Sequence, residues 1–103
     1  MTLLGDNPQH YNDWFICTLY SMSEGIVERT RNRDEVFSKT GIGAFPDNEI
    51  GAADAIVQYL AVERKPPLIS LANERNVRLT ADGLRYCRQN CEVWITRLGL
   101  RRP

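Results

Sequence analysis

The residue types that most often carry chemistry are few in this sequence. Cysteines stand at positions 17, 87 and 91, and His10 is the single histidine. Cys87 and Cys91 are four residues apart, so on a helix they would share a face and could together hold a soft metal ion. A zinc site needs a third and a fourth ligand, and the sequence supplies no cluster that contains them. We therefore expect no metal site.

The three cysteines, Cys17, Cys87 and Cys91, are expected to be reduced thiols in the core. Their number is odd, no CxxC pair is present, and each lies in an apolar, helix-like stretch. Such usage is typical of cytoplasmic proteins rather than of disulfide-bonded scaffolds. The start of the sequence lacks the features of a signal peptide, and no apolar stretch approaches the roughly 20 residues of a membrane span. The sequence thus predicts a cytoplasmic protein that does not contact a membrane.

Catalytic patterns are also missing from the sequence. We find no glycine-rich phosphate loop, no nucleophile motif and no cluster of metal ligands. His10 stands near the start of the first expected helix, where a surface position is the simplest interpretation. We therefore expect neither an enzyme nor a cofactor.

Basic residues gather in two segments of a chain whose charges balance, with 13 basic and 13 acidic residues. Neutrality permits nucleic-acid binding only if the basic residues cluster on one face. The two segments could hold phosphates. A solvated, charged face is an equally good interpretation, because Glu28, Asp34 and Glu35 are interspersed among the basic residues. The candidates are Arg29, Arg31, Arg33 and Lys39 in one segment, and Arg75 and Arg78 in the other.

Three helices are expected before the second basic segment. Asn7 and Pro8 are typical of a helix start, and the first helix should end near residues 23–25. Asn32, with Glu35 three residues later, predicts the cap of a second helix that stops at Gly41. A third helix should begin after Asp47 and end at Pro66 and Pro67, since proline cannot continue it. Its buried stripe would be Ile50, Ala53, Ile56, Val57, Leu60 and Ala61.

A β-hairpin and one last helix complete the expected elements. Residues 68–71 and 77–79 are short β runs around a polar turn, which predicts an antiparallel pair. Thr80 is the expected cap of the final helix. The core-facing stripe of that helix would be Leu84, Cys87, Cys91, Trp94, Ile95 and Leu98.

Two of these segments resemble a known family. Residues 77–84, VRLTADGL, are similar to the point where the winged helix-turn-helix superfamily joins its second wing strand to a helix. Residues 34–42 resemble the second helix and turn of that family, and 47–65 stand where its recognition helix lies. The resemblance spans Trp14 to Trp94. It implies a mainly α fold with a small β-hairpin: three helices, a wing hairpin and a C-terminal helix, with DNA contacts from the second helix, the third helix and the wing.

The third helix is unusual for a helix that reads DNA. Its expected exposed face carries no Arg or Lys, and only Asn48 is placed to read a base, with Gln58 at the flank. Asp47, Glu49 and Asp54 would repel phosphates. The small residues of this face permit close approach either of thymine methyl groups or of a helix of a partner protein. The expected exposed face is Asn48, Gly51, Ala52, Ala55, Tyr59 and Val62.

Two apolar features predict self-association. The first helix is apolar nearly all round, and the last helix carries a second apolar stripe opposite its core stripe. Two-fold dimers are the commonest oligomers, and a chain of 103 residues has room for only a modest core. The expected interface residues are Tyr11, Trp14, Tyr20, Tyr86, Val93 and Leu100.

The sequence therefore supports two hypotheses for a single domain of residues 1–103, with 1–7 and 101–103 loose. In the first, a homodimeric regulator binds double-stranded DNA without a cofactor. In the second, a winged-helix module binds a protein partner through the 47–62 helix and binds little or no DNA. For DNA binding, the candidate residues are Arg31, Arg33, Lys39, Asn48, Tyr59, Arg75 and Arg78.

Overall fold

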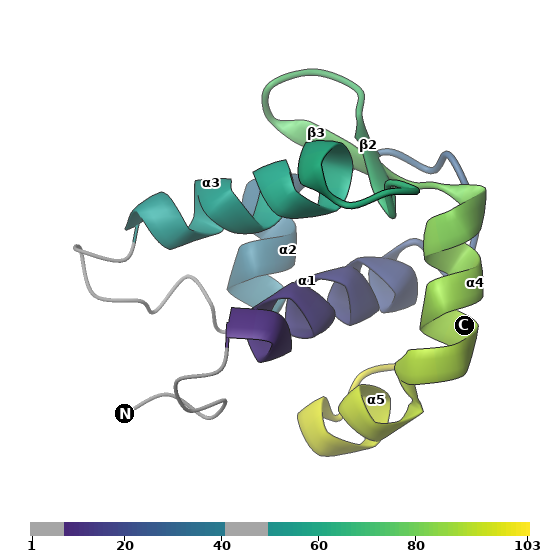
Figure 1. Cartoon of the computed structure of the whole chain (residues 1–103). Helices are drawn as coiled ribbons and strands as arrows, with labels where there is room; N and C mark the ends of the chain where they lie inside the picture. The colour runs from purple at the N-terminus through teal and green to yellow at the C-terminus, as the bar shows by residue number, and fades with distance from the viewer. Residues whose placement is uncertain (1–7, 41–49) are drawn as a thin grey trace.

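In the computed structural model, which describes residues 8–40 and 50–103, most of the chain is helical and a small antiparallel sheet packs on the helices (Figure 1). This confirms the predicted class of a mainly α protein with a small β component. Asn7, Gly41, Asp47 and Asn48 lie outside the described residues. The described elements are α1 (Pro8–Met22), β1 (Arg31–Asn32), α2 (Arg33–Thr40), α3 (Ile50–Gln58), a π-helical segment η3 (Tyr59–Glu63), β2 (Ile69–Leu71), β3 (Asn76–Leu79), α4 (Ala81–Asn90) and α5 (Glu92–Leu98).

Helix α1 runs through the middle of the molecule. It contacts α2, α3, α4, α5 and β3, and every residue from Trp14 to Leu19 is buried. In Figure 1, α3 lies above α1 and α5 lies below it. A helix that is apolar all round is buried on all sides. Packing against other elements of the same chain therefore accounts for the apolar residues on all sides of α1.

The predicted hairpin is confirmed. Strands β2 and β3 are antiparallel, with Ile69 opposite Leu79 and Leu71 opposite Val77. Ile69, Val77 and Leu79 are fully buried, as the period of two requires for one face of a sheet. The side chain of Asn73 shapes the turn, because its Oδ1 accepts hydrogen bonds from the backbone N–H groups of Arg75 (2.9 Å) and Asn76 (3.1 Å).

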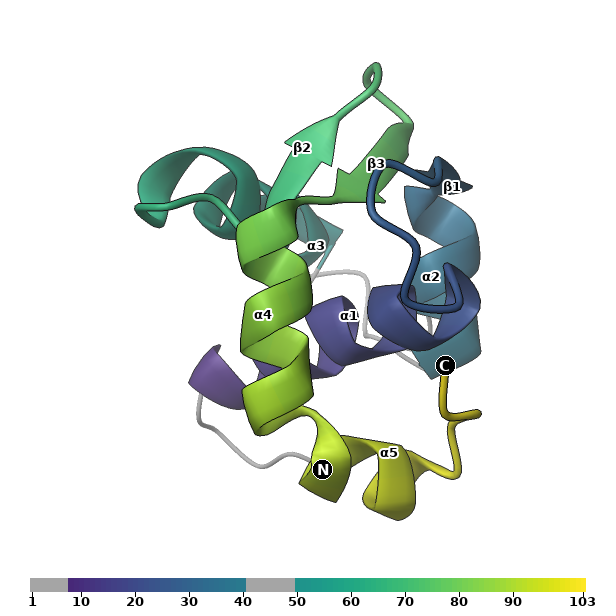
Figure 2. The same ribbon diagram turned by 90° about the vertical axis from the view of Figure 1, so that its right-hand side faces the viewer.

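A third strand, which the sequence analysis did not predict, lies beside β3. Strand β1 pairs with β3 through Arg31 opposite Val77, so the order in the sheet is β1-β3-β2 (Figure 2). The backbone N–H of Glu28 also donates to Leu79 O over 3.1 Å. β1 has only two residues, both polar, so no alternation in hydropathy marks it.

The junction between β3 and α4 depends on Thr80 and Gly83. Thr80 Oγ1 accepts from Gly83 N over 2.9 Å and donates to Pro67 O over 2.8 Å. A Cβ atom on Gly83 would lie 1.9 Å from Leu68 O, so only glycine allows this approach of α4 to the chain before β2. The predicted cap at Thr80 is confirmed, with α4 beginning at Ala81.

The predicted cap of the second helix is confirmed as well. Asn32 Oδ1 accepts from Asp34 N over 2.8 Å and from Glu35 N over 3.4 Å, at the start of α2. Asn32 thus serves as the last residue of β1 and as the side chain that starts α2.

The third helix ends earlier than predicted and in a wider turn. Arg64 N donates to Tyr59 O, five residues back, over 2.8 Å, which closes the π-helical turn of η3. Arg64 itself is extended, and Pro66 and Pro67 follow without amide hydrogens to continue the helix. Ile56, Val57 and Leu60 are buried, as the predicted stripe requires.

The single last helix of the sequence analysis is wrong. The structure has two helices, α4 and α5, which meet at Cys91 and run in different directions (Figure 2). Asn90 Nδ2 donates to Tyr86 O over 2.9 Å, and such a side-chain bond competes with the helical ladder at that carbonyl. Two backbone hydrogen bonds are kept at the bend, from Cys91 N to Cys87 O and from Ile95 N to Cys91 O.

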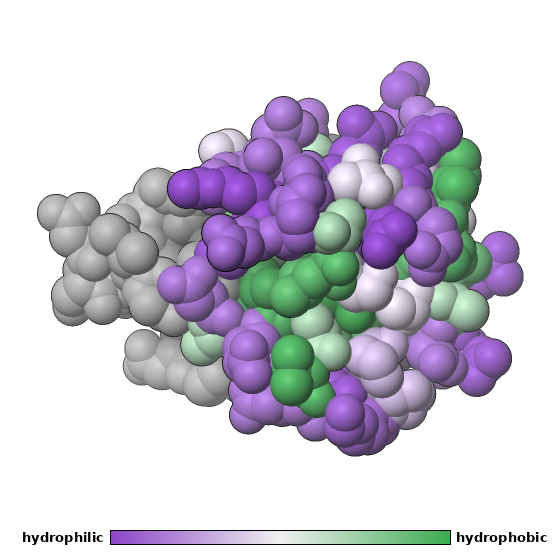
Figure 3. Space-filling model, turned by 90° about the horizontal axis from the view of Figure 1, so that it is seen from above, coloured by the Kyte–Doolittle hydropathy of each residue, from purple (hydrophilic) through white to green (hydrophobic). Residues whose placement is uncertain are grey.

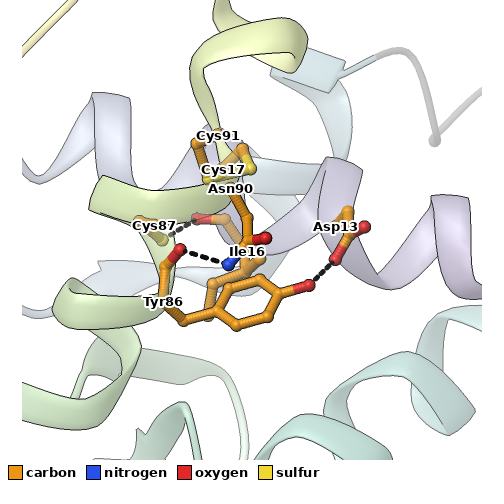
Figure 4. Close-up of a disulfide and its surroundings, with 7 residues drawn as sticks. All are labelled: Asp13, Ile16, Cys17, Tyr86, Cys87, Asn90 and Cys91. Atoms are coloured by element: carbon orange, nitrogen blue, oxygen red, sulfur yellow. Dashed lines mark hydrogen bonds between the residues drawn. A yellow bond between two sulfur atoms is a disulfide. The ribbon is translucent and has the colours of Figure 1, made fainter.

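The expectation of three reduced cysteines is also wrong. Cys17 in α1 and Cys91 at the bend form a disulfide across 74 residues of sequence, with their Cα atoms 5.4 Å apart (Figure 4). Cys87 is a buried thiol whose Sγ donates to Ile16 O over 3.7 Å. Burial, with a smaller contribution from Asp13, raises the pKa of Cys87 above its ordinary value. Because Cys91 is bonded to Cys17, the pair Cys87 and Cys91 cannot hold a metal ion in this form.

The C-terminal residues, expected to be loose, contact the rest of the chain. Ser21 Oγ donates to Arg101 O over 2.6 Å, and Arg102 forms an ion pair with Glu92. These contacts hold the tail beside the end of α1 and the start of α5.

Candidate nucleic-acid interface

Four of the predicted phosphate-binding residues lie on elements that meet at one corner of the molecule, with Arg31 (opposite Val77) and Arg78 on opposite faces of the sheet. Arg31 is in β1, Arg33 begins α2, Arg75 is in the hairpin turn and Arg78 is in β3. The sheet register places Arg31 opposite Val77, and Arg33 N donates to Arg75 O over 2.8 Å. We call Arg31, Arg33, Arg75 and Arg78 the arginine corner. Sheet pairing thus joins two basic segments that are about forty residues apart in sequence.

Three of the four arginines already have carboxylate partners. Arg75 Nη1 lies 3.1 Å from Asp34 Oδ2, and Arg78 Nη1 lies 3.5 Å from Glu28 Oε2. Arg33 pairs with Asp54 of α3. The arginine corner is therefore close to electrically balanced.

Arg33 is the least accessible of these paired arginines. Its side chain is 19% exposed, against 73% for Arg75. Its guanidinium lies 5.8 Å from the ring centre of Phe37, one turn along α2, and also reaches Asp54 on α3. Arg33 is thus placed to hold α2 against α3 rather than to present its charge to a ligand.

Arg31 and Lys39 differ from the paired residues. Within the described part of the chain Arg31 makes no ion pair, and its buried Nε has no hydrogen-bond partner. Lys39 is exposed in the last turn of α2, at the opposite end of that helix from Arg33. It lines a separate depression of about 490 Å³ with Met22, Asp34, Glu35 and Ser38. Lys39 is therefore not part of the arginine corner.

A smaller depression, of about 290 Å³, lies at the arginine corner. It is lined by two arginines and three acidic residues, so its formal charge is negative. Such a surface does not attract phosphate unless its ion pairs open. The lining residues are Arg33, Asp34, Asp54, Glu74 and Arg75.

The described exposed face of α3 and η3 carries no basic side chain before Arg64. Asp54, Ala55 and Gln58 are exposed. Tyr59, a predicted DNA contact, is half-buried and packs against the core. Asn48 lies outside the described residues, so its predicted contact with a base stays a prediction.

Apolar side chains also reach the surface near α3 and the hairpin. Figure 3, seen from above the view of Figure 1, shows mostly hydrophilic side chains with an apolar area in the middle. Val62 in η3 and Leu71 in β2 are each 46% exposed. The sequence analysis placed Val62 on the exposed face but did not identify Leu71, because alternation along β2 assigns it to the inner face of the sheet.

Five of the six residues predicted at a dimer interface are partly or fully buried within the chain. Trp14 is 4% exposed and belongs to the core, whereas Val93 on α5 is 62% exposed. The hydroxyl of Tyr86 donates to Asp13, and its ring lies 4.9 Å from the Arg64 guanidinium (Figure 4 shows the first contact). The other three pack half-buried against the core: Tyr11, Tyr20 and Leu100.

Comparison of the chain with protein-family models, with curated proteins and with solved structures gave no match.

No three His, Cys, Asp or Glu side chains among residues 8–40 and 50–103 are grouped so that they could hold a metal ion. In the same part of the chain, none of the helices has the length and apolar character needed to cross a bilayer. The arginine corner is therefore the candidate binding site in the described part of the chain.

Proposed function

We propose that this chain is a winged helix-turn-helix protein that binds double-stranded DNA and regulates transcription. The element order supports this proposal, since α2, α3 and the β2–β3 hairpin follow one another as the second helix, recognition helix and wing do in that superfamily. The observation that carries it is that sheet pairing brings the two basic segments together, with Arg75 in the hairpin turn and Arg31 and Arg78 on adjacent strands.

In this proposal Arg31, Arg75 and Arg78 contact the DNA backbone and α3 enters the major groove. Arg75 in the turn is the most exposed, and Arg31 and Arg78 lie in the adjacent strands. Arg33 positions α2 against α3, and Lys39 makes a separate phosphate contact at the far end of α2. Exposed ion pairs contribute only about 0 to 1 kcal/mol each, so phosphates can replace carboxylates as partners of Arg75 and Arg78.

A titration of a short random-sequence duplex, followed by fluorescence anisotropy at several salt concentrations, tests the proposal. Affinity should fall steeply with salt, and Arg31→Ala/Arg75→Ala should flatten the logarithmic slope by about 0.9 for each lost phosphate contact. The control is Arg85→Ala/Arg88→Ala, which removes the same charge from α4. A flat titration of folded protein at low salt would contradict DNA binding.

A second candidate function is favoured by the ion pairs themselves. Three of the four corner arginines have partners, and the surface near α3 includes exposed Val62 and Leu71. These features suit a winged-helix module that binds a protein partner through α3 and η3. Negligible DNA binding at physiological salt, with loss of partner binding in folded Ala55→Leu protein, would favour this function over the first.

The homodimer remains part of the proposal, with Val93 as its most exposed apolar residue. Light scattering should give twice the chain mass, and Val93→Asp should reduce it to one chain without changing the helical signal. A single-chain mass of the unmodified protein well above micromolar concentration would contradict the dimer.

The cytoplasmic location predicted from the sequence is weakened by the Cys17–Cys91 disulfide. Disulfides are rare in the cytoplasm of most organisms but common in intracellular proteins of hyperthermophiles.

A further inference from the structure

Two carboxylates, those of Asp34 and Asp54, lie beside the arginines of the arginine corner. Asp34 and Asp54 line the depression of about 290 Å³ together with the two arginines that they contact. Asp54 is on α3, 71% exposed, and pairs with Arg33 of α2; Asp34 is on α2, 60% exposed, and pairs with Arg75 of the turn. Each pair therefore joins two elements and forms only when the chain folds.

We propose that Asp34 and Asp54 form a carboxylate gate, which suppresses sequence-independent DNA binding at the arginine corner. This inference rests on the proposed DNA binding. A phosphate that approaches Arg75 must first displace the carboxylate of Asp34, and it meets the exposed carboxylate of Asp54 in the same depression. The displaced carboxylate then still faces the DNA backbone, where like charges repel.

The gate acts on every DNA sequence alike, because the backbone carries the same charge throughout. A site that also makes good contacts with α3 gains enough binding energy to open the gate, whereas other sequences do not. Specificity is a difference of affinities, and a repulsive element directed against the wrong ligands increases that difference. The gate would thus compensate for a third helix whose described exposed face has no basic residue.

The size of the effect follows from what exposed ion pairs contribute. Such a pair changes an equilibrium by up to about fivefold. The Asp34–Arg75 pair should therefore weaken binding to random DNA by up to about fivefold, and repulsion of the DNA backbone by exposed Asp54 adds to this effect. Removing the carboxylates should also steepen the dependence on salt, because no cation has to return to a displaced carboxylate.

The test compares unmodified protein with Asp34→Asn/Asp54→Asn in a titration of random-sequence duplex. The matched control is Asp82→Asn/Glu92→Gln, which changes the net charge by the same amount. Asp82 and Glu92 lie in the first turns of α4 and α5, as Asp34 lies in the first turn of α2. We expect the gate variant to bind about tenfold more tightly or better, with a steeper salt slope, and the control to change less than twofold.

A double-mutant cycle shows whether Asp34 acts through its arginine. In a background of Arg75→Ala, Asp34→Asn should give a smaller gain in affinity than in the unmodified protein, because only its repulsion of the DNA backbone is then removed. If the gate and control variants gained the same affinity, the change in net charge alone would explain the gain, and the carboxylate gate would be overturned. Unchanged or weaker binding by the gate variant would overturn it as well, because the pairs would then serve only the fold.

The same titration separates failure of the gate from failure of the proposed function. Thermal melting first shows that the unmodified protein and the gate variant are both folded. If neither then binds DNA at low salt, the proposed function is wrong, and the carboxylate gate, which rests on it, is wrong as well. If only the gate variant binds, the gate is supported. Binding by both at equal affinity leaves DNA binding in place and overturns the gate alone.

Discussion

At the scale of single residues, Gly83 decides how closely α4 approaches the chain before β2. The space for its side chain is occupied by backbone, since a Cβ atom would lie 1.9 Å from Leu68 O. Backbone cannot rotate away as a flexible side chain can, so the helix or the strand would have to shift. The glycine of residues 77–84, the segment that resembles the wing junction, is thus required in this chain for steric reasons.

Gly83→Ala should lower the free energy of unfolding by about 3 kcal/mol or more, as forced overpacking does in well-packed interiors. Urea unfolding measures the change. Gly99→Ala is the comparison, because Gly99 has a φ of +65° but no atom within 4 Å of its added Cβ. It should cost only about 1 kcal/mol, from backbone strain. An equal loss in both variants would argue against the contact with Leu68.

Thr80→Ala should lower the free energy of unfolding by about 1 kcal/mol, because Gly83 N and Pro67 O both lose their partner at Thr80 Oγ1. The control is Thr96→Ala in α5, whose side chain is exposed. That change should stay within about 0.5 kcal/mol of the unmodified protein. A neutral Thr80→Ala in urea unfolding would contradict the cap.

At the scale of elements, Asn32 links the sheet to α2. Asn32→Ala removes the acceptor of Asp34 N and Glu35 N and should lower the free energy of unfolding by about 1 kcal/mol. Ser38→Ala, at an exposed position of the same helix, should have little effect. Amide hydrogen exchange should also show faster exchange at Asp34 and Glu35 in the Asn32 variant, and unchanged rates there would contradict the assignment.

The elements with strong local signals were predictable from the sequence. Thr80 and Asn32 mark helix starts because their short polar side chains bond nearby amides, and the β2–β3 hairpin shows the alternation of a half-buried sheet. Strand β1 was not predictable, because two polar residues carry no period. The bend at Cys91 was missed because the apolar stripe continues across it, so the pattern alone indicates one helix.

The candidate site was predictable only in part. The basic residues could be named from their types, and the acidic residues among them were evident. Which acid meets which arginine depends on tertiary structure, since Arg33 and Asp54 are 21 residues apart and Asp34 and Arg75 are 41 apart. Such pairs leave no periodic signal, and the electrical balance of the arginine corner could not be read from the sequence.

At the scale of the whole molecule, the Cys17–Cys91 disulfide joins α1 to the bend between α4 and α5. It closes a loop of more than seventy residues, so the chain-entropy model gives a stabilisation of about 4 kcal/mol. Cys17→Ser/Cys91→Ser should therefore unfold at much lower urea concentration. An unchanged midpoint would show that the disulfide does not form in solution.

Mass spectrometry after alkylation checks the cysteine assignment directly. Denatured, non-reduced protein should gain one alkyl group, at Cys87, and reduced protein should gain three. In the folded protein Cys87 should react slowly, because burial raises its pKa and keeps the reactive thiolate scarce. Three alkyl groups on non-reduced, denatured protein would contradict the disulfide.

The central position of α1 has a consequence for synthesis on the ribosome. Residues 14–19 leave the ribosome before two of the helices that cover them, α4 and α5, which extend to Leu98. Until α4 and α5 have emerged, the side of α1 that they cover is an exposed apolar surface, to which chaperones bind and through which unfinished chains aggregate. Folding must therefore wait until α5 has emerged, and fragments that stop before α4 should be insoluble.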